Sequence, residues 1–569
     1  MDYENINEKF KKFKLKTSSD SMKKLCLPKK FKLQPSQKFL GELMSYKNGP
    51  KNILIYHKIG AGKTCTAINI AEKMKKKMKI MVVLPAALIG NFRNELRSEC
   101  PGNEYITITN RNKLKKLNPN ELEYKNILKK SNKKIDKYYE ILSYHKFLAL
   151  CKNCKVKLKN YLLIIDEIQN MISESGTFYN NLKKQIESTD ESLRIVLLSA
   201  TPMFDKPVEI ALTLNLLKIK NKLPIGNEFN KKYLKIKKNK DGFYYSSKNL
   251  NLFKESIKGL VSYYRGAPPQ AFPEEIFKIV RCQMQPFQWS SYLTSLSSEE
   301  SYLRGSFRNV DILKLPSNFF LGPRMISNVA FPNKSIGIKG FKSFNKKTLQ
   351  VQNIKDYSIK FYKIYKKLGK SEGPVFIYSN FKESGGIKSL ARFLESRGYK
   401  DYKTYGEGPK RFAVWTGDEK HYIKENIKFT FNKKENMNGD LIKIMLGSPS
   451  IKEGVSLLRV SQVHILEPYW NLSRMLQIQG RAIRYCSHKD VAKRRRQVEI
   501  FLYIATYPGR RTIDQYIWSL ARKKNKLIGK FEKALKEMAI YCKLFYERNV
   551  YSDEDELNCY QDDLEKIYF

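Results

Sequence analysis

The stretch "NILIYHKIGAGKTCTA", Asn52–Ala67, decides the fold. It starts with an apolar run typical of a buried strand, and a helical pattern begins directly after its glycine-rich turn. The strict form of a phosphate-binding loop has glycine where this chain has His57, but the shorter Gly-x-Gly-Lys-Thr form is intact. The order of strand, turn and helix favours a nucleotide-binding loop in a parallel α/β sheet over a chance glycine turn.

The residues of this turn have the chemistry that a nucleoside triphosphate needs. Gly60 and Gly62 let backbone N–H groups curl around phosphates. Lys63 would reach the β- and γ-phosphates, and Thr64 would hold Mg²⁺. The helix that starts here adds its positive dipole end. We therefore expect ATP and Mg²⁺ as cofactors.

Two later strands end in polar residues. The stretch "YLLIIDEIQNM" ends its apolar run at Asp166 and Glu167, which suit Mg²⁺ coordination and polarisation of an attacking water. The alternative is a pair of helix-capping acids. In "RIVLLSATPMFD", Ser199 and Thr201 stand at a strand end, where they could couple to the metal-site acids or simply form a turn before a proline.

Short β-branched runs alternate with helical patterns in two blocks, residues 31–217 and 355–525, and predict two tandem parallel α/β domains. The expected strands are "NILIYH", "KIMVVLP", "YEILSY", "YLLIID" and "RIVLLSA" in the first block and "PVFIYS", "FAVWTG", "IKIMLGS", "QVHILEP" and "EIFLYIA" in the second. Residues 218–354 carry weak helical periods and predict a helical insertion between the domains. Residues 1–30 are lysine-rich and predict a flexible arm or a short helix. Residues 526–569 begin as a basic helix and end acidic, which predicts a solvated tail or, alternatively, a protein-docking segment.

Charge is the outlying property of this chain of 569 residues, with 107 Lys and Arg against 55 Asp and Glu and a net charge of +52. Such a surplus fits a polyanion, because neutralised phosphates release counterions. The alternative is a coding bias, since Lys, Asn and Ile are abundant. A membrane surface is a weaker third choice, because no basic amphipathic helix stands out. No apolar run approaches the ~20 residues of a membrane span, and the N-terminus lacks a signal-peptide core. We expect a soluble intracellular protein.

The nine cysteines are scattered and odd in number, which predicts reduced thiols. Cys151 and Cys154 form a single Cys-x-x-Cys, and no second pair stands at zinc-binding spacing. The sequence therefore disfavours a structural zinc site.

The stretch "EPYWNLSRMLQIQGRAIRYCSH" in the second block places Arg481 and Arg484 three residues apart, behind Gln477. One helix carrying both arginines would present them on one face, ready for an anion. The alternative is a solvated basic helix. Upstream of the first block, the Gln37 amide could bind an adenine edge with one donor and one acceptor.

Together these motifs resemble superfamily 2 helicases and translocases, whose ATP site lies between two RecA-like domains. The "EPYWN" stretch with "QIQGRAIR", and "CQMQPFQWSSYL" between the blocks, are similar to elements of Swi/Snf-type double-stranded DNA translocases. The viral branch that includes poxvirus nucleoside triphosphatase I and the early transcription factor small subunit is similar over about residues 31–545. One position departs from the family pattern: Gln169 stands where the family usually has His.

The resemblance implies a role for each matching position. Arg481, Arg484 and Gln477 would approach the γ-phosphate, Asp166 and Glu167 would serve metal and water, and Ser199 and Thr201 would couple hydrolysis to movement. The nucleotide would be held by Gln37, Ile59, Gly60, Ala61, Gly62, Lys63, Thr64, Cys65 and, from the second domain, Gly454, beside Glu453 and Ser456. Positions near nucleic acid would be Pro85–Asn91, Ser143, Tyr144 and Ser379–Phe381.

The function expected from this resemblance is a DNA-dependent ATPase and translocase of viral transcription, in initiation or in termination and transcript release. Its partners would be double-stranded DNA and a virus-encoded RNA polymerase or transcription factor subunit, in the virion and the host cytoplasm, from a large DNA virus or a cytoplasmic linear plasmid. The alternatives are a strand-separating DNA or RNA helicase and a non-enzymatic basic virion protein.

Overall fold

The computed structural model describes residues 10–14, 21–26, 31–46, 49–58, 60–152, 158–173, 176–239, 242–302, 318–452, 455–550 and 556–559. The chain divides into two compact units. Unit 1 comprises residues 1–236, 245–271 and 526–569, and unit 2 comprises residues 237–244 and 272–525. No helix in the described ranges combines the length and the apolar character that a membrane span requires.

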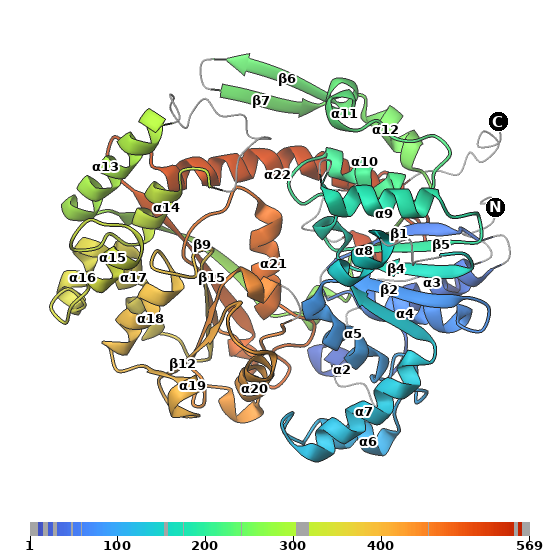
Figure 1. The fold of residues 1–569 in the computed structure, drawn as a ribbon, viewed down its shortest axis with the longest axis horizontal. Coiled ribbons are helices and arrows are strands. Elements are labelled where there is room, and N and C mark those ends of the chain that lie inside the picture. The colour runs from blue at the N-terminus through green and yellow to red at the C-terminus, as the bar shows by residue number, and fades with distance from the viewer. Residues whose placement is uncertain are drawn as a thin grey trace. The chain divides into compact units, whose positions relative to one another are not determined.

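Unit 1 is built on a parallel sheet with helices on both faces (Figure 1). The strand order is β3-β2-β4-β5-β1-β8. The five strands expected from the first block all form. The strands are β1 (Asn52–His57), β2 (Lys79–Leu84), β3 (Tyr139–Ser143), β4 (Tyr161–Ile165), β5 (Arg194–Ser199) and β8 (Val261–Tyr264). The helices are α2 (Met22–Cys26), α3 (Pro35–Ser45), α4 (Lys63–Met74), α5 (Ile89–Leu96), α6 (Ile108–Leu114), α7 (Leu122–Asp136), α8 (Tyr144–Lys152), α9 (Thr177–Glu187), α10 (Val208–Asn215), α11 (Gly226–Tyr233), α12 (Leu250–Ile257) and α23 (Tyr546–Asn549).

The register of this sheet places the expected site residues at one edge. Tyr56 of β1 lies opposite Ser199 of β5, and Ile165 of β4 lies opposite Leu197. Because all these strands run in the same direction, the residues that follow them emerge at the same carboxyl edge. The glycine turn, the acidic pair and the Ser199 turn therefore meet there.

Both ends of the chain contribute to the core of unit 1. Phe10 packs edge-on against Phe39 with ring centroids 5.0 Å apart, and Tyr541 packs against the same ring at 4.9 Å. Phe545 lies in the same buried cluster. The described parts of the N-terminal arm are a 3-10 turn (Lys11–Phe13) and helix α2. The expectation of a solvated tail is wrong for this part of the tail, because Tyr541 and Phe545 are buried against Phe39 of α3.

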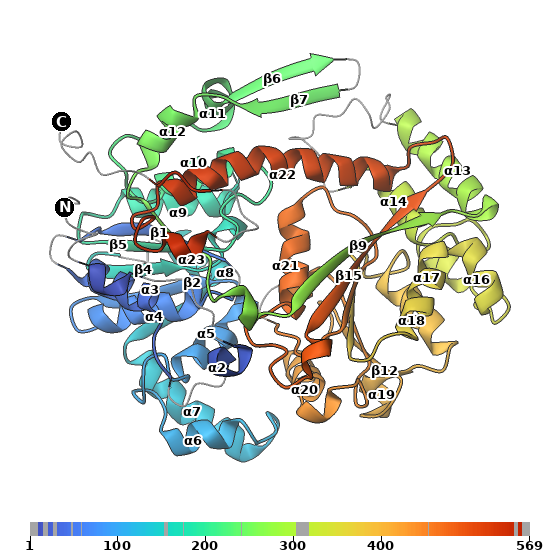
Figure 2. The same ribbon diagram turned by 180° about the vertical axis from the view of Figure 1, so that it is seen from behind.

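Unit 2 is a second parallel sheet with the order β11-β12-β13-β10-β14-β15-β9 (Figure 2). The five strands expected from the second block all form. The strands are β9 (Glu274–Gln283), β10 (Val375–Tyr378), β11 (Lys400–Asp401), β12 (Arg411–Trp415), β13 (Ile444–Gly447), β14 (Gln462–Ile465) and β15 (Gln497–Thr506). The helices are α13 (Pro286–Tyr302), α14 (Leu321–Asn328), α15 (Gly337–Lys342), α16 (Val351–Tyr357), α17 (Ile359–Leu368), α18 (Ile387–Glu395), α19 (Tyr402–Tyr405), α20 (His421–Phe431) and α21 (Leu472–Ala482). Helix α22 (Ile513–Glu537) begins in unit 2 and ends in unit 1.

The sheet of unit 2 is buried on both faces. Along β10, Val375 and Ile377 belong to one buried cluster and Phe376 and Tyr378 to another. Successive strand residues point to opposite faces, so two separate cores flank this sheet. This explains why the strands inside this sheet, such as β10 and β13, are apolar runs in the sequence.

The segment 218–354 contributes a strand to each sheet. Strand β8 pairs with β1, and the ten-residue β9 pairs with β15 at the edge of the second sheet. Most residues of β9 are exposed or half-buried, so the apolar run that identifies a central strand is missing there. A two-stranded sheet of β6 (Leu234–Asn239) and β7 (Gly242–Ser247) stands outside both main sheets.

Candidate active site

The glycine turn after β1 leads directly into α4. Gly60 and Gly62 have φ values of +84° and +75°, in the left-handed region that suits glycine. A Cβ atom at Gly62 would lie 2.5 Å from the Nε2 atom of Gln37. Helix α4 starts at Lys63, so its unpaired N–H groups face the turn. This geometry fits a phosphate cradle; Ile59 lies outside the described residues.

Gln37 lies beneath this turn rather than open to solvent. Its Nε2 donates to the Gly62 carbonyl at 3.2 Å, and its Oε1 accepts from the Gln34 N–H at 2.8 Å. The backbone carbonyl of Gln37 accepts from Asn69 of α4 at 2.7 Å. The amide expected to bind adenine is therefore already engaged with the protein through one of its two N–H groups and one lone pair of its oxygen.

Lys63 forms a buried ion-pair cluster with the two acids. Its Nζ lies 3.1 Å from Asp166 Oδ1 and 2.8 Å from Glu167 Oε1. Burial favours the neutral amine, but the two carboxylates outweigh it and hold the pKa of Lys63 above its usual value. Burial raises the pKa of the Asp166 carboxyl, although Lys63 opposes this. The donor set of carboxylate and nearby Thr64 hydroxyl oxygens suits Mg²⁺.

The backbone at the acidic pair is strained and held in place. Glu167 has a φ of +52°, which is uncommon for a residue with a side chain. The Tyr144 hydroxyl donates to the backbone carbonyl of Asp166 at 2.5 Å and to that of Glu167 at 2.9 Å. Tyr144, expected near nucleic acid, is instead buried and positions the acids. The sequence offered no signal for this contact.

Gln169 connects the acids to the Ser199 turn. Its Nε2 donates to Glu167 Oε2 at 2.5 Å, and its Oε1 accepts from the Ser199 hydroxyl at 2.7 Å. The Ser199 Oγ atom in turn accepts from the Thr201 N–H at 3.0 Å. A continuous path of hydrogen bonds therefore runs from Lys63 to Thr201. Gln169, which departs from the family pattern, joins the two halves of this path.

His57 is the last residue of β1, and its side chain contacts Ser262 and Tyr541. The ring is fully buried, and burial lowers its pKa to about 3, so it is neutral. Its Nε2 lies 3.0 Å from the Ser262 hydroxyl and 3.2 Å from the Tyr541 hydroxyl. The end of β1, which precedes the glycine turn, is therefore hydrogen-bonded to β8 and to the C-terminal segment. No local sequence pattern could reveal this, because Tyr541 lies far along the chain.

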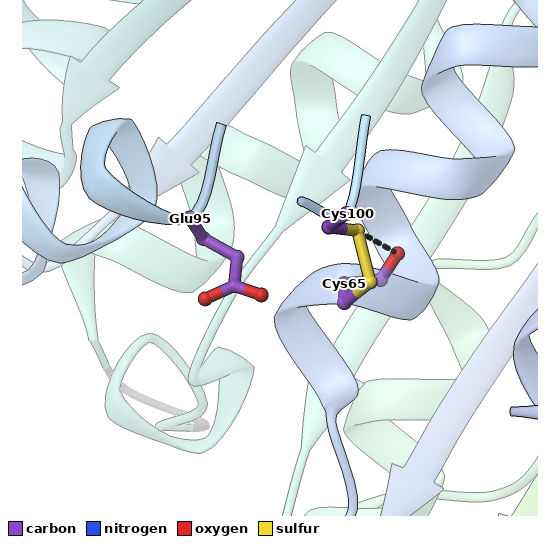
Figure 3. Close-up of side chains that lie close together, drawn as sticks. All are labelled: Cys65, Glu95 and Cys100. Atoms are coloured by element: carbon purple, nitrogen blue, oxygen red, sulfur yellow. Dashed lines mark hydrogen bonds between the residues drawn. A yellow bond between two sulfur atoms is a disulfide. The ribbon is translucent and has the colours of Figure 1, made fainter. Parts of the chain in front are cut away.

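The structure corrects the expectation of reduced cysteines. A disulfide joins Cys65, next to Thr64, to Cys100, with the Glu95 side chain nearby (Figure 3). A second disulfide joins Cys542 to Cys559. The fold brings these cysteines together, which their spacing in the sequence does not show. Among the described residues, Cys65, Glu95 and Cys100 form the one cluster of three or more histidine, cysteine or acidic donors close enough to share a metal ion, and the disulfide occupies its two sulfurs.

The outcome for the other cysteines is mixed. Cys151 is free, whereas Cys154 lies outside the described residues, so a pairing between them is not described. Burial raises the pKa of the Cys151 thiol to about 11, which disfavours the thiolate that zinc requires.

In unit 2, Arg481 and Arg484 converge on one backbone atom. Arg481 Nη1 and Arg484 Nη2 donate to the Val455 carbonyl at 3.3 and 3.2 Å, and Arg481 Nε donates to the Gln477 carbonyl at 3.1 Å. The expectation that one helix carries both arginines is wrong. Helix α21 ends at Ala482, and the next residue is extended, so Arg484 reaches the same point from beyond the helix. Gly454 and Glu453 lie outside the described residues, directly before Val455.

Glu467, at the start of the "EPYWN" stretch, is the centre of a buried polar network. It accepts hydrogen bonds from Ser379, from the backbone and side chain of Asn380, and from Asn328, at 2.5 to 3.2 Å. Asn471 caps α21 by accepting from the Arg474 N–H at 3.3 Å. With Arg481 only 9% exposed, the alternative of a solvated basic helix does not apply.

Residues 37–328 match the model of the SNF2-related domain, and residues 359–486 match that of the helicase conserved C-terminal domain. The chain belongs to the SNF2-related superfamily 2 proteins. It is therefore an ATP hydrolase of the helicase type, and its two parallel sheets are the RecA-like domains of that family.

Relatives of this SNF2-related chain include proteins of large DNA viruses. A protein of Acanthamoeba polyphaga mimivirus, R563, named as a candidate ATP-dependent RNA helicase, is 49% identical and covers 98% of this chain and 97% of its own length. An African swine fever virus protein named a termination factor NPH-I homolog is 26% identical, covering 86% of this chain and 76% of its own length. The helicase domain of Hef from Pyrococcus furiosus covers 85% of this chain and 97% of its own length with 14% identity and a TM-score of 0.42.

Several positions that the SNF2-related pattern suggests for nucleic acid are internal. Ser379 is fully buried and bonded to Glu467. The Phe381 ring lies under the Arg324 guanidinium at 5.1 Å, and Trp470 lies 4.8 Å from the same group. The segment Pro85–Asn91 differs, because it follows a strand end and includes exposed residues such as Gly90, which has open space around it.

Proposed function

We propose that the chain couples ATP hydrolysis in unit 1 to movement along nucleic acid. The observation that carries this proposal is the hydrogen-bonded path from Lys63 through Glu167 and Gln169 to Ser199 and Thr201. Such a path lets a change at the carboxylates reach a second loop of the same sheet edge. A purely structural ion pair does not require this continuation.

Each residue of the path has a proposed role. Lys63 exchanges its carboxylate partners for the β- and γ-phosphates of ATP, while Gly60, Ala61, Gly62 and the backbone at Cys65 hold the phosphates. Thr64 and Asp166 would hold Mg²⁺, which would supply charge neutralisation on the phosphates. Glu167 orients the water that attacks, and its strained backbone keeps its carboxylate aimed at that position.

The remaining predicted residues complete the proposed site. Gln37 and Ile59 would contact the nucleotide base side. Arg481 and Arg484, with Gln477 and Gly454, would stabilise the charge of the transferred phosphoryl group, a contribution worth on the order of a thousandfold in rate. Two guanidinium groups gathered on the Val455 carbonyl concentrate positive charge at one point, and this supports an anion as their ligand.

We further propose that the nucleic acid is double-stranded DNA and that the protein acts in viral transcription with a virus-encoded RNA polymerase or transcription factor subunit, in the virion and the infected cytoplasm. The net charge of +52 and the name of the African swine fever virus relative support this. The second candidate is strand separation on RNA or DNA, which the name of the mimivirus relative favours.

The test of the site is Lys63→Ala, compared with Lys73→Ala on the exposed end of the same helix. We expect Lys63→Ala to abolish ATP hydrolysis stimulated by duplex DNA and Lys73→Ala to retain it, as measured by phosphate release. Equal activity of the two variants would contradict the site assignment.

The test of the movement uses two substrates. A translocase displaces the third strand of a DNA triplex without separating a forked duplex, whereas a helicase separates the fork. Separation of the fork alone would favour the second candidate.

A further inference from the structure

The hairpin of β6 and β7 lies outside the machinery described above. Seven lysines and one acidic residue, Asp241, fall between residues 231 and 248. The lysines are Lys231, Lys232, Lys235, Lys237, Lys238, Lys240 and Lys248. The segment therefore has a high local positive charge, even for this basic chain.

Strand β6 begins at the buried Leu234, and the next three side chains are open to solvent on both faces. Lys235, Ile236 and Lys237 are three consecutive exposed residues of this strand. Because successive side chains of a strand point to opposite faces, neither face is buried there. Ile236 is 47% exposed and Tyr244 of β7 is 38% exposed. A two-stranded sheet of this kind is only marginally stable in water without further support.

The support comes from the base of the hairpin. Tyr233, directly before β6, is fully buried against Phe229 and Phe253, with ring centroids 5.0 and 5.5 Å away. Phe531 packs against Phe253 at 5.2 Å. The Lys248 N–H donates to the Tyr233 carbonyl at 2.8 Å. Figure 1 shows helices α11 and α12 at this base of the hairpin. These buried aromatic contacts therefore anchor the base of the hairpin.

The exposed side chains alternate charge with apolar surface. Lys235 and Lys237 lie on one face of β6 and Ile236 on the other. The Tyr244 ring has the ammonium group of Lys523 at 4.5 Å from its centroid. Exposed lysines and an exposed aromatic ring on one two-stranded sheet match the two surfaces of single-stranded nucleic acid, because lysines bind phosphates and an unpaired base stacks on the ring. A duplex offers phosphates and base edges but no free base face for Tyr244.

We propose that the β6–β7 hairpin is a binding element for single-stranded nucleic acid. Lys235 and Lys237 bind the phosphate backbone, and Tyr244 stacks on a base. This inference rests on the proposed nucleic-acid-dependent function and adds a contact for an unpaired strand, such as one displaced as the protein advances. It gives the chain an element that distinguishes unpaired from paired nucleic acid.

The experiment measures equilibrium binding without ATP, so its result does not depend on hydrolysis. A fluorescently labelled oligothymidylate of about 20 nucleotides, long enough for a site of roughly 4–16 nucleotides, is titrated with the full chain at several salt concentrations. The variants are Lys235→Gln/Lys237→Gln and Tyr244→Ala. The matched control, Lys76→Gln/Lys77→Gln, removes the same charge from an exposed turn after α4.

We expect the hairpin lysine variant to lower the slope of log affinity against log salt by about 0.7 for each phosphate that the protein no longer neutralises. Tyr244→Ala should weaken single-strand binding by at least about fivefold with little change in that slope. The control should change the slope by much less. Circular dichroism melting establishes that all variants are folded.

Two results would overturn the proposal. One is a hairpin lysine variant that behaves like the control. The other is a duplex of the same length whose affinity for Tyr244→Ala falls as much as that of the single strand, which would assign the hairpin to duplex binding. Failure of the proposed function is separate, because it would show as absent stimulation of ATP hydrolysis in the unchanged protein.

Discussion

Two buried lysine–carboxylate clusters among the described residues, one from each unit, make an instructive pair. Lys63 faces Asp166 and Glu167 in unit 1, and its side chain keeps 11% of its surface exposed. Lys360 faces Asp514 in unit 2 at 2.6 Å, with 0% and 1% exposed. Asp514 also accepts from the Ala505 N–H at 2.9 Å, and Lys360 also donates to Asn328 at 2.9 Å.

The difference between these clusters lies in what completes them. The unit 2 pair has its hydrogen-bonding partners in place and no access to solvent, so exchange of its charges is costly. The unit 1 cluster borders a glycine turn and includes a residue in a strained backbone conformation. A buried ion pair is therefore structural or functional according to its surroundings, and the following predictions test this contrast.

The largest effect is expected at Arg484 of unit 2, which belongs to neither of the two lysine–carboxylate clusters. Arg484 donates to the Val455 carbonyl, and the proposed site assigns it to a phosphoryl group, so Arg484→Ala should lower turnover by about a thousandfold. Nucleotide binding, measured with a fluorescent ATP analogue, should persist. Arg494→Ala changes an exposed arginine of the same unit and should leave turnover near that of the unchanged protein. Retained turnover in Arg484→Ala would remove this arginine from the site.

The next effect concerns stability. Lys360→Met leaves the Asp514 carboxylate buried without its cation and should lower the free energy of unfolding by about 3–5 kcal/mol. All four tryptophans, Trp289, Trp415, Trp470 and Trp518, lie in unit 2, so urea titration of tryptophan fluorescence reports this unit.

The same substitution at Lys63 is the matched comparison. Lys63→Met should cost on the order of 1 kcal/mol, followed by circular dichroism, while abolishing turnover. A smaller loss in the free energy of unfolding for Lys360→Met than for Lys63→Met would contradict the contrast between the two clusters.

The smallest effect sharpens the path within unit 1. Gln169→Ala removes the bridge between Glu167 and Ser199 and should reduce the ratio of DNA-stimulated to unstimulated hydrolysis about tenfold, the equivalent of about 1.4 kcal/mol. Gln169→His should recover most of this ratio, because the two ring nitrogens can serve one donor and one acceptor role. A ratio unchanged in Gln169→Ala would show that the path does not carry the coupling.

Local patterns sufficed for much of the fold. Ten strands of the two sheets were predicted, because each contains a short apolar run, and all of them except β3 lie inside their sheet. Strand β9 escaped prediction because it lies at a sheet edge and exposes most of its side chains. Strand β8 is only four residues long, "VSYY", and too short for its period to stand out.

The residues of the candidate site also fall into those that local patterns predicted and those that they did not. Lys63, Asp166 and Glu167 were identified because each follows a recognisable strand, and the structure places the Lys63 ammonium within 3.1 Å of both carboxylates. The contacts of Tyr144 and Tyr541 could not be predicted, since a single tyrosine carries no spacing signal. The Cys65–Cys100 disulfide depends on where α5 ends relative to α4, which only the packed structure defines.

Unit 1 is assembled from three separated segments, and this has a consequence for synthesis on the ribosome. Residues up to 236 emerge early, but Tyr541 and Phe545 of the same core emerge about 300 residues later. At a rate of roughly 5–20 residues per second, that interval is about 15–60 seconds. During it, β1 has no His57–Tyr541 contact and Phe39 lacks two of its ring neighbours. The nucleotide-binding domain begins first and is completed last, so the nascent chain carries an unfinished core while all of unit 2 is being made.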